Sequence, residues 1–435
     1  MTGSIPIGLQ EPQTARLANG LRVVHMRIPG AVAVGASLGV DVGSADEPDG
    51  WSGISHFLEH LVFRGTAAFA DSMAIGQAIE AVGGDFNAFT GKSYTQYICS
   101  APLQYRDLVT RIPAELVVRP LFRQEDVEDE RPVVIREIGL SEDSAGQRVS
   151  RALEQASWPD SPMARPIIGR PDTLEQVTAA EVRRYWQGHY RPEKATFALA
   201  GDLSLDDALD LIERAVGPWQ PIATDIPAAS APRFPDTGPV RLETMDGRQE
   251  TVLALGVPVG PWRSIDQAGT SVLAALAGEG EGSFLARDLI RRRGLLHSGG
   301  ALAWLNRDAG VFGLTGTTRP ADALAAAEGI LAILRRLQRL PEPADYRRAI
   351  GYVRGDSLRQ WTRPLDVAIQ LCHQALMGDT QYGPLHDLRE LATVTPERVQ
   401  ALAQGLFTPN QLRLALAGPA TNIADVARII SAPAA

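Results

Sequence analysis

The sequence has little cysteine and no excess of positive charge. It contains 2 cysteines among 435 residues, Cys99 and Cys372, both in apolar settings. A disulfide framework is therefore not expected. The formal net charge of −9 argues against nucleic-acid binding, because that function needs a basic surface.

Long apolar segments are absent as well. No run of roughly 18 apolar residues occurs, and the N-terminus lacks a basic segment followed by an apolar core. The sequence therefore predicts neither a membrane span nor a signal peptide. We expect a cytoplasmic protein, with a periplasmic one as the alternative if a signal peptide has been removed.

Histidine is also scarce, yet two of the 7 histidines stand four residues apart, in the segment 56–60. Because positions i, i+3 and i+4 of a helix share a face, His56, Glu59 and His60 would point into the same space. Two imidazoles make half of a tetrahedral zinc site, and the carboxylate between them can act as a base. The order H-x-x-E-H is the inverse of the commoner H-E-x-x-H metalloprotease helix. The alternative is a coincidental pair on an amphipathic helix, but burying that face without a metal would be costly.

The residues around this motif have helical spacing. Ser52 or Ser55 is a candidate N-cap, and Gly65 is a candidate stop. Apolar residues recur at helical intervals between them, at Ile54, Phe57, Leu58, Leu61 and Val62.

A catalytic zinc needs a third protein ligand, and the segment 128–138 is the best place to look for it. Glu130 and Glu137 are seven residues apart, close to two helical turns, so both could face the same way. The alternative is a solvated acidic helix start. Pro132 complicates the geometry, because proline suits a first turn and kinks a helix interior.

At this point the sequence resembles the pitrilysin family of zinc peptidases, in particular its half-length branch, which includes the mitochondrial processing peptidase. The matching segments keep their order and spacing over most of the first half. They are residues 42–45, 53–66, 83–90, 130–137, 165–169, 190–192 and 200–202.

The resemblance implies a role for each matching residue. His56, His60 and Glu137 would bind one Zn²⁺ per chain, and Glu59 would be the general base. Glu130 would support the site from the outer shell, as carboxylates that orient a ligating imidazole do. The segment Phe86-Asn87-Ala88 would be an edge strand that receives an extended peptide by strand addition. The alternative for Asn87 is an ordinary turn residue.

The second half departs from the family pattern. The resemblance implies an arginine and, seven residues later, a tyrosine, both aimed at the substrate. Ile290 and His297 occupy these positions. His297 can still donate a hydrogen bond to a substrate, whereas Ile290 cannot do the work of an arginine. Either Arg291 has taken over the role or a paralogous subunit supplies the pair. We therefore expect a heterodimer, with a homodimer as the alternative.

An internal repeat indicates two domains. Thr178 and Thr395 begin similar helix–strand segments that end at Gly201 and Gly418, both 217 positions apart. We predict a zinc-bearing domain 1–216, a linker 217–239 and a C-terminal repeat domain 240–435. Each is expected to be α+β, a mainly antiparallel sheet packed with helices. Strands are predicted at 21–25, 32–40, 94–99, 250–257, 311–314 and 411–416. A shift of 217 carries the zinc positions onto Leu273, Leu276 and Ala277, so the repeat would lack the metal motif.

The expected function is zinc-dependent endopeptidase activity on peptides or short unfolded polypeptides, in the metal-bearing subunit of a two-subunit enzyme. Glu59 would take a proton from the attacking water and return it to the leaving amine. One alternative is a dedicated maturase of a single peptide precursor, for example in quinone-cofactor biosynthesis. Another is a non-catalytic core or scaffold subunit, which an intact set of metal-binding residues disfavours.

Overall fold

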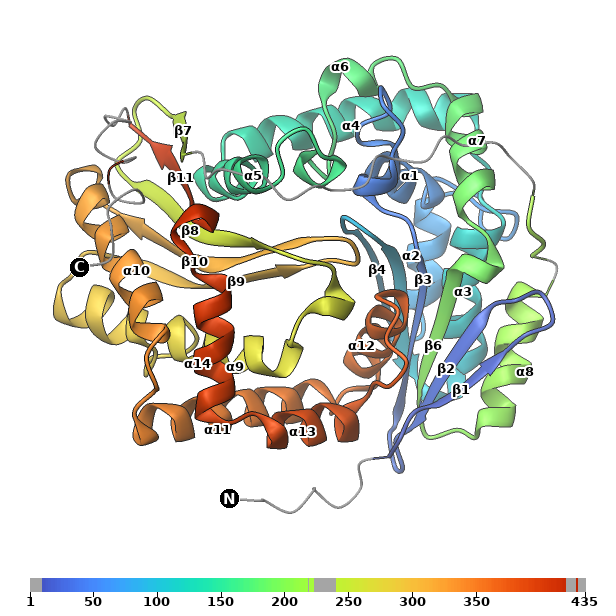
Figure 1. Ribbon diagram of the computed structural model, residues 1–435. Coiled ribbons are helices and arrows are strands. Elements are labelled where there is room, and N and C mark those ends of the chain that lie inside the picture. Colours follow the sequence, from blue (N-terminus) through green and yellow to red (C-terminus); the bar gives the residue numbers. More distant parts are fainter. Residues whose placement is uncertain (1–9, 218, 223–239, 420–427, 429–435) are drawn as a thin grey trace. The chain divides into compact units, whose positions relative to one another are not determined.

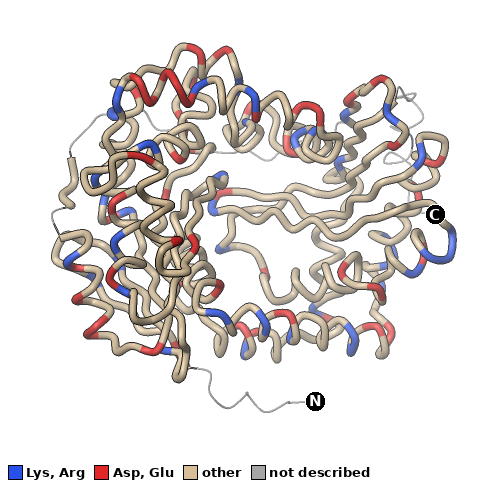
Figure 2. The backbone as a smooth tube through the Cα atoms, turned by 180° about the vertical axis from the view of Figure 1, so that it is seen from behind, with Lys and Arg blue, Asp and Glu red and all other residues tan. Residues whose placement is uncertain are grey.

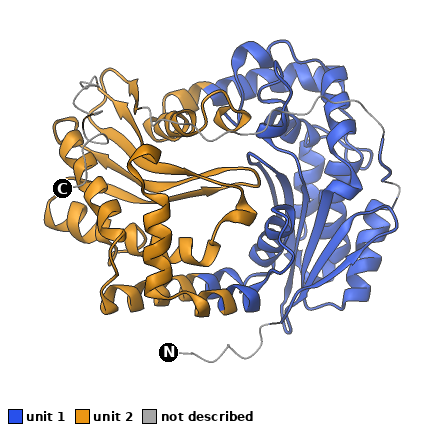
Figure 3. Cartoon of the chain, in the orientation of Figure 1, with its two compact units in different colours: residues 1–138, 166–229, 357–388 blue, residues 139–165, 230–356, 389–435 orange. Residues whose placement is uncertain are grey.

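The computed structural model describes residues 10–217, 219–222, 240–419 and 428 (Figure 1). These residues divide into two compact units (Figure 3). Unit 1 consists of residues 1–138, 166–229 and 357–388, and unit 2 of residues 139–165, 230–356 and 389–435.

Unit 1 is built on a six-stranded sheet in the order β1-β2-β6-β3-β5-β4. All neighbouring strands are antiparallel except the parallel pair β2 and β6. The strands are β1 Gln13–Arg16, β2 Arg22–Arg27, β3 Ala33–Val40, β4 Asp85–Thr90, β5 Thr95–Pro102 and β6 Ala195–Gly201. Strand β4 therefore forms one edge of this sheet.

Helices cover both faces of the unit 1 sheet. They are α1 Ile54–Val62, α2 Ser72–Glu80, α3 Arg106–Val118, α6 Pro171–Leu174, α7 Ala179–His189, α8 Leu205–Val216 and α12 Pro364–Leu376. Side chains alternate along β3: Val34 and Leu38 belong to the same buried core as α1 and α3, while Gly35 and Gly39 face α12. A Cβ at Gly35 would lie 2.4 Å from the backbone of Leu365, so the glycine lets α12 approach the sheet closely.

Unit 2 repeats this plan with a five-stranded sheet in the order β7-β11-β8-β10-β9. Its one parallel pair is β7 and β11. The strands are β7 Val240–Thr244, β8 Thr251–Val259, β9 Ser298–Leu305, β10 Gly310–Thr318 and β11 Arg413–Gly418. The helices within this unit are α5 Ala145–Ser157, α9 Gln267–Ala277, α10 Ala323–Leu337, α14 Pro396–Leu406 and a π-helical segment Ala286–Arg292.

Three helices run across the boundary between the units in the chain: α4 Gln124–Glu142, α11 Pro343–Gln360 and α13 Pro384–Thr393. Single 3-10 turns connect several of the elements. They are Ser44–Asp46, Leu103–Tyr105, Pro162–Ala164, Pro192–Lys194, Trp262–Ser264, Pro320–Asp322 and Pro409–Gln411.

The internal repeat predicted from the sequence is present in the element order. Helices α3 and α10 begin at Arg106 and Ala323, and α7 and α14 at Ala179 and Pro396, each pair 217 positions apart. The expected fold, two α+β domains with mainly antiparallel sheets, is confirmed. All six predicted strands are present, with ends shifted by up to four residues.

The compact units differ from the linear halves of the chain in one respect. Helix α5, from the first half, packs on β7, β8 and β11 of unit 2, and α12, from the second half, packs on β2, β3, β5 and β6 of unit 1. Each of these helices follows a long helix, α4 or α11, at the same place in the repeat. Because of this exchange of helices, cutting the chain at the predicted linker would not separate the two compact units. Most of that linker, residues 218 and 223–239, lies outside the described residues.

Charge and apolar side chains are segregated as expected for two buried sheets. In Figure 2 most Lys, Arg, Asp and Glu positions lie on helices and loops, while the strands are mostly free of them. One cluster of buried apolar residues fills each unit. Within the part of the chain that the structure describes, none of the helices combines the length and apolarity that crossing a membrane requires.

Candidate metal centre

Helix α1 carries His56, Glu59 and His60, and its start is fixed by a residue that the sequence analysis missed. The predicted caps, Ser52 and Ser55, do not cap it: Gly53 is the N-cap residue and provides no side-chain cap. Instead the buried carboxylate of Glu47 accepts hydrogen bonds from the backbone N–H groups of Gly53, at 2.8 Å, and Ser55, at 2.9 Å. The cap prediction was wrong because this acceptor lies outside the local cap window.

Glycines allow the start of α1 to pack closely against another loop of unit 1. Gly53 has φ of +96°, and a Cβ there would lie 2.6 Å from the Cα of Gly169, which itself has φ of +80°. Only glycine adopts such angles without strain, and only glycine fits this contact. Ile54, Phe57 and Leu61 then anchor the helix in the core, since all three are fully buried.

Helix α4 brings Glu130 and Glu137 to α1. It continues through Pro132 without ending, so the proline does not separate the two glutamates. Buried Val127, Val134 and Ile138 pack the same helix into the core of unit 1. The guanidinium of Arg131 donates to the backbone oxygens of Leu174 and Val177, which ties α4 to the segment after α6.

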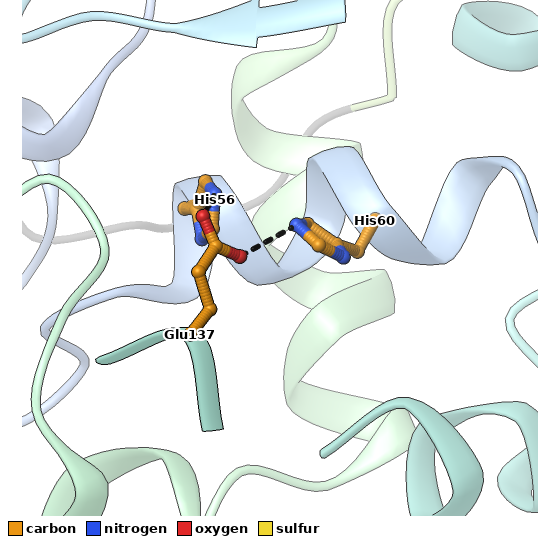
Figure 4. Close-up of side chains that lie close together, drawn as sticks. All are labelled: His56, His60 and Glu137. Carbon is orange, nitrogen blue, oxygen red and sulfur yellow. Dashed lines mark ion pairs between the residues drawn. The ribbon is translucent and has the colours of Figure 1, made fainter. Parts of the chain in front are cut away.

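The side chains of His56, His60 and Glu137 converge on one point (Figure 4). The carboxylate of Glu137 lies 3.4 Å from His60 Nε2 and 3.8 Å from His56 Nε2. One ligand atom from each residue lies within 4.8 Å of the other two. Two ligands at zinc bond lengths on a tetrahedral centre are separated by about 3.3 Å, which is close to these distances. The three residues therefore fit a zinc ion.

The exposure of the three side chains shows from which side the centre is open. The side chain of His56 is 10% exposed and that of His60 is 24% exposed, whereas Glu137 is 45% exposed. The α1 side is thus closed by protein and the Glu137 side faces solvent.

Glu130 is hydrogen-bonded to the ring nitrogen of His60 that is turned away from Glu137. Its Oε1 lies 2.9 Å from Nδ1 of His60, and its Oε2 lies 3.5 Å from the Arg64 guanidinium. When Nδ1 carries the proton and donates to Glu130, the lone pair of Nε2 is directed toward Glu137 and is available for a metal. The sequence analysis predicted a supporting role for Glu130, and the structure places its carboxylate at the ring nitrogen of His60 that is turned away from Glu137.

The electrostatics of the centre differ between the two imidazoles. Burial, followed by the effect of His60, lowers the pKa of His56 to about 3, so His56 is neutral at physiological pH. Burial also lowers the pKa of His60, but the hydrogen bond and charge of Glu130 and the charges of Glu59 and Glu137 outweigh it, and the net pKa is raised. A divalent cation would offset this concentration of negative charge.

Glu59 is held beside the centre by a second residue that the sequence analysis did not single out, Thr90. The Thr90 hydroxyl donates to Glu59 Oε2 at 2.5 Å. Burial raises the pKa of the Glu59 carboxyl, although hydrogen bonding to Thr90 lowers it in part. A carboxylate with a raised pKa is a better proton acceptor near neutral pH.

The predicted substrate-binding segment lies on the edge strand β4. Phe86 packs against Phe63, with ring centroids 5.6 Å apart, and Ala88 is buried. Asn87 is exposed and is part of the strand rather than a turn. Strand β4 also contacts α1, so the edge and the metal centre are neighbours in unit 1 (Figure 1).

The remaining predicted residues lie in unit 2. Ile290 belongs to the π-helical segment and packs against the apolar core. Arg291 is exposed and forms an ion pair with Glu281. His297 is exposed, just before β9, and its Nδ1 lies 3.2 Å from Glu250 Oε1. The positions shifted by 217 from the metal motif are Leu273, Leu276 and Ala277. They are buried in α9, and their apolar side chains offer no ligand atom for a metal.

The chain consists of two repeats of a sheet packed with helices, and the first repeat carries a cluster of two histidines and a glutamate. These features indicate the class of protein to which the chain belongs. Family models agree with this division. The model described as Insulinase (Peptidase family M16) matches residues 22–171, and the model described as Peptidase M16 inactive domain matches residues 176–351.

Relatives match along nearly the whole chain. An uncharacterized zinc protease of Mycobacterium leprae is 30% identical over 90% of this chain and 88% of its own length. Uncharacterized zinc proteases of Streptomyces coelicolor and Bacillus subtilis are 28% and 26% identical over 92% and 93% of this chain, and over 88% and 98% of their own lengths. The chain belongs to peptidase family M16, and the resemblance found in the sequence is confirmed.

Solved structures share the fold. A protease from Helicobacter pylori has a TM-score of 0.88 at 22% identity, covering 94% of this chain and 100% of its own. A peptidase M16 inactive domain from Pseudomonas fluorescens has a TM-score of 0.85 at 18% identity, covering 95% and 98%. A chain of complex III from Candida albicans has a TM-score of 0.79 at 15% identity, covering 93% and 95%.

Proposed function

We propose that this chain is the metal-bearing chain of a zinc endopeptidase that hydrolyses peptides or short unfolded polypeptides. The observation that carries the proposal is the convergence of His56, His60 and Glu137 on one point, with Glu59 held next to it. Membership of family M16, whose relatives are named zinc proteases, supports the same reaction class.

The residues of the chain have distinct tasks in this reaction. A bound zinc ion would supply Lewis-acid polarisation of water and of the substrate carbonyl. His56, His60 and Glu137 would hold the ion, and Glu130, hydrogen-bonded to Nδ1 of His60, would keep the His60 ring oriented. Glu59 accepts a proton from the attacking water and returns it to the leaving amine nitrogen.

The open edge of β4 supports an extended peptide as the substrate. An edge strand pairs with any extended backbone through its N–H and C=O groups, whatever the side chains are. Unfolded segments present such a backbone, whereas a folded domain does not. Phe86, Asn87 and Ala88 are accordingly proposed as substrate contacts in unit 1.

A paralogous subunit is proposed to complete the active enzyme. The packing of Ile290 against the core of unit 2, and the ion pair of the exposed Arg291 with Glu281, support this part. The chain alone is expected to hydrolyse fluorescein-labelled casein weakly or not at all. Casein hydrolysis at full rate by the monodisperse single chain, with no second subunit present, would rule the partner out.

Metal analysis tests the centre. If these three residues form one zinc site, the protein as purified should hold about one zinc per chain. His60→Ala and Glu137→Ala should lose it, while the exposed control Glu213→Ala should keep it. Glu59→Gln should keep zinc and lose hydrolysis. Retention of zinc by either ligand variant would remove that residue from the proposed ligand set, and an active Glu59→Gln variant would remove Glu59 from the base role.

A further inference from the structure

The pairing of β4 with β5 determines which of its N–H groups face the open edge. Gly91 N–H donates to Tyr94 O at 2.7 Å just beyond the strand end. Residues of an antiparallel pair alternate between hydrogen-bonded and non-hydrogen-bonded positions, so Thr90, Ala88 and Phe86 occupy the non-hydrogen-bonded ones. Their N–H groups therefore point away from β5, toward the edge.

Two of these edge donors are covered by side chains of the strand itself. The N–H of Phe86 donates to Asp85 Oδ1 and the N–H of Ala88 donates to Asn87 Oδ1, both at 2.9 Å. Each acceptor belongs to the preceding residue, so the two bonds are local. Local side-chain bonds of this kind contribute about 1 kcal/mol each and yield to a competing strand.

The third edge residue is tied to another element. The Thr90 hydroxyl donates to Glu59 Oε2 of helix α1 at 2.5 Å. A hydrogen bond to a charged acceptor is about twice as strong as a neutral one. A peptide that displaced Thr90 would also release the carboxylate of Glu59.

We infer that Thr90 is a positioning residue for Glu59, and that it ends the row of donors which β4 offers to an extended peptide. The inference rests on the proposed function. A peptide accepts hydrogen bonds from Phe86 and Ala88, and Asp85 and Asn87 give these donors up. At Thr90 the row stops, so the next peptide group lies beside the Glu59 carboxylate. The register of cleavage is then set by the backbone of β4 and does not depend on substrate side chains.

Three variants test the positioning role in the holoenzyme, assayed with the subunit that co-elutes from its host. Thr90→Val removes the hydroxyl at nearly constant shape, Thr90→Ser keeps it, and Thr315→Val is a matched control. Thr315 is a strand residue of unit 2 whose hydroxyl donates to Leu253 O at 3.0 Å. The probe is fluorescein-labelled casein.

We expect Thr90→Val to lower kcat about tenfold to a hundredfold, since a misplacement of about 1 Å at a reacting group costs that much. KM and zinc content should stay within about twofold of those of the unmodified enzyme, because the Thr90 hydroxyl contacts neither ligand nor peptide. Thr90→Ser should restore most of kcat, and Thr315→Val should leave it unchanged. Unchanged kcat in Thr90→Val, or no rescue by serine, would overturn the inference.

A crystal structure of zinc-loaded Thr90→Val separates this inference from the proposed function. The Glu59 carboxylate should leave the position that it occupies in the unmodified protein, while His56, His60 and Glu137 stay in place. If Glu59 keeps its position, the inference is wrong, whatever the activity. If the unmodified holoenzyme cleaves no casein but Glu59 moves in the variant, the proposed function fails and the positioning role of Thr90 stands.

Discussion

Glu47 should control both the stability of helix α1 and the affinity for zinc. Its buried carboxylate accepts hydrogen bonds from the N–H groups of Gly53 and Ser55, which lie three residues and one residue before His56. In Glu47→Ala both donors remain buried without this acceptor. Hydrogen bonds to a charged group contribute about 1.5–3 kcal/mol each, so the loss should amount to about 3–6 kcal/mol of local stability.

The assay should report on α1 alone, because a chain of two units need not unfold in one step. Hydrogen–deuterium exchange of peptides covering residues 54–62 gives the free energy of local opening. We expect the exchange of these peptides to be faster by a factor of at least about 100 in Glu47→Ala, which corresponds to about 3 kcal/mol. Peptides from unit 2 should exchange as before.

Two further variants make the test discriminating. Glu47→Gln keeps one acceptor oxygen, so its effect should be about half that of Glu47→Ala on the free-energy scale. Glu213→Ala, at an exposed position of α8, should leave the exchange of α1 unchanged. If Glu47→Ala exchanges in α1 at the rate of the unmodified protein, the capping role of Glu47 is refuted.

Other variants test the outer shell, the glycine contact and a buried acid. Glu130→Ala should weaken zinc binding about 10- to 100-fold in a chelator competition assay. Glu130→Gln should weaken it less, because its amide oxygen still accepts a hydrogen bond from His60. A zinc affinity of Glu130→Ala equal to that of the unmodified protein would contradict the outer-shell role. Gly53→Ala should destabilise the protein by at least about 1–3 kcal/mol in thermal unfolding, because φ is +96° there; an unchanged Tm would show that the backbone adapts. Burial raises the pKa of Asp387 to about 6 from 3.8. Between pH 3.8 and pH 6 the folded protein therefore keeps a proton that the unfolded chain loses. The stability of the fold falls as the pH rises through this range, and it stays reduced above pH 6. Asp387→Asn should therefore gain up to about 3 kcal/mol relative to the unmodified protein between pH 4 and pH 8 in urea unfolding; a pH-independent difference would contradict the shift.

The sequence predicts most of the candidate centre because its chemistry is local. Helical periodicity places His56, Glu59 and His60 on one face of α1, and Glu130 and Glu137 lie about two turns apart on a second helix, α4. Spacing alone left Glu137 undecided, and the resemblance to the peptidase family favoured it as a ligand. In the structure Glu137 does lie next to both imidazoles.

The residues that the sequence analysis missed act across the fold. Glu47 lies six residues before Gly53, the N-cap residue of α1, and Thr90 lies 31 residues after Glu59, so no local pattern marks either contact. Strand β9 was missed because it begins with Ser298, Gly299 and Gly300, which are poor strand formers. The exchange of α5 and α12 between the units was missed for a related reason. An amphipathic helix shows that it covers a sheet, but its sequence does not say which sheet.

The central claim is that one zinc ion is held by His56, His60 and Glu137. Crystals grown with zinc and measured on both sides of the zinc absorption edge test it most directly. We predict one anomalous peak per chain, about 2.0–2.2 Å from Nε2 of both histidines and from a carboxylate oxygen of Glu137. A map without a peak there, with Glu137 turned away from the two imidazoles, would contradict the claim.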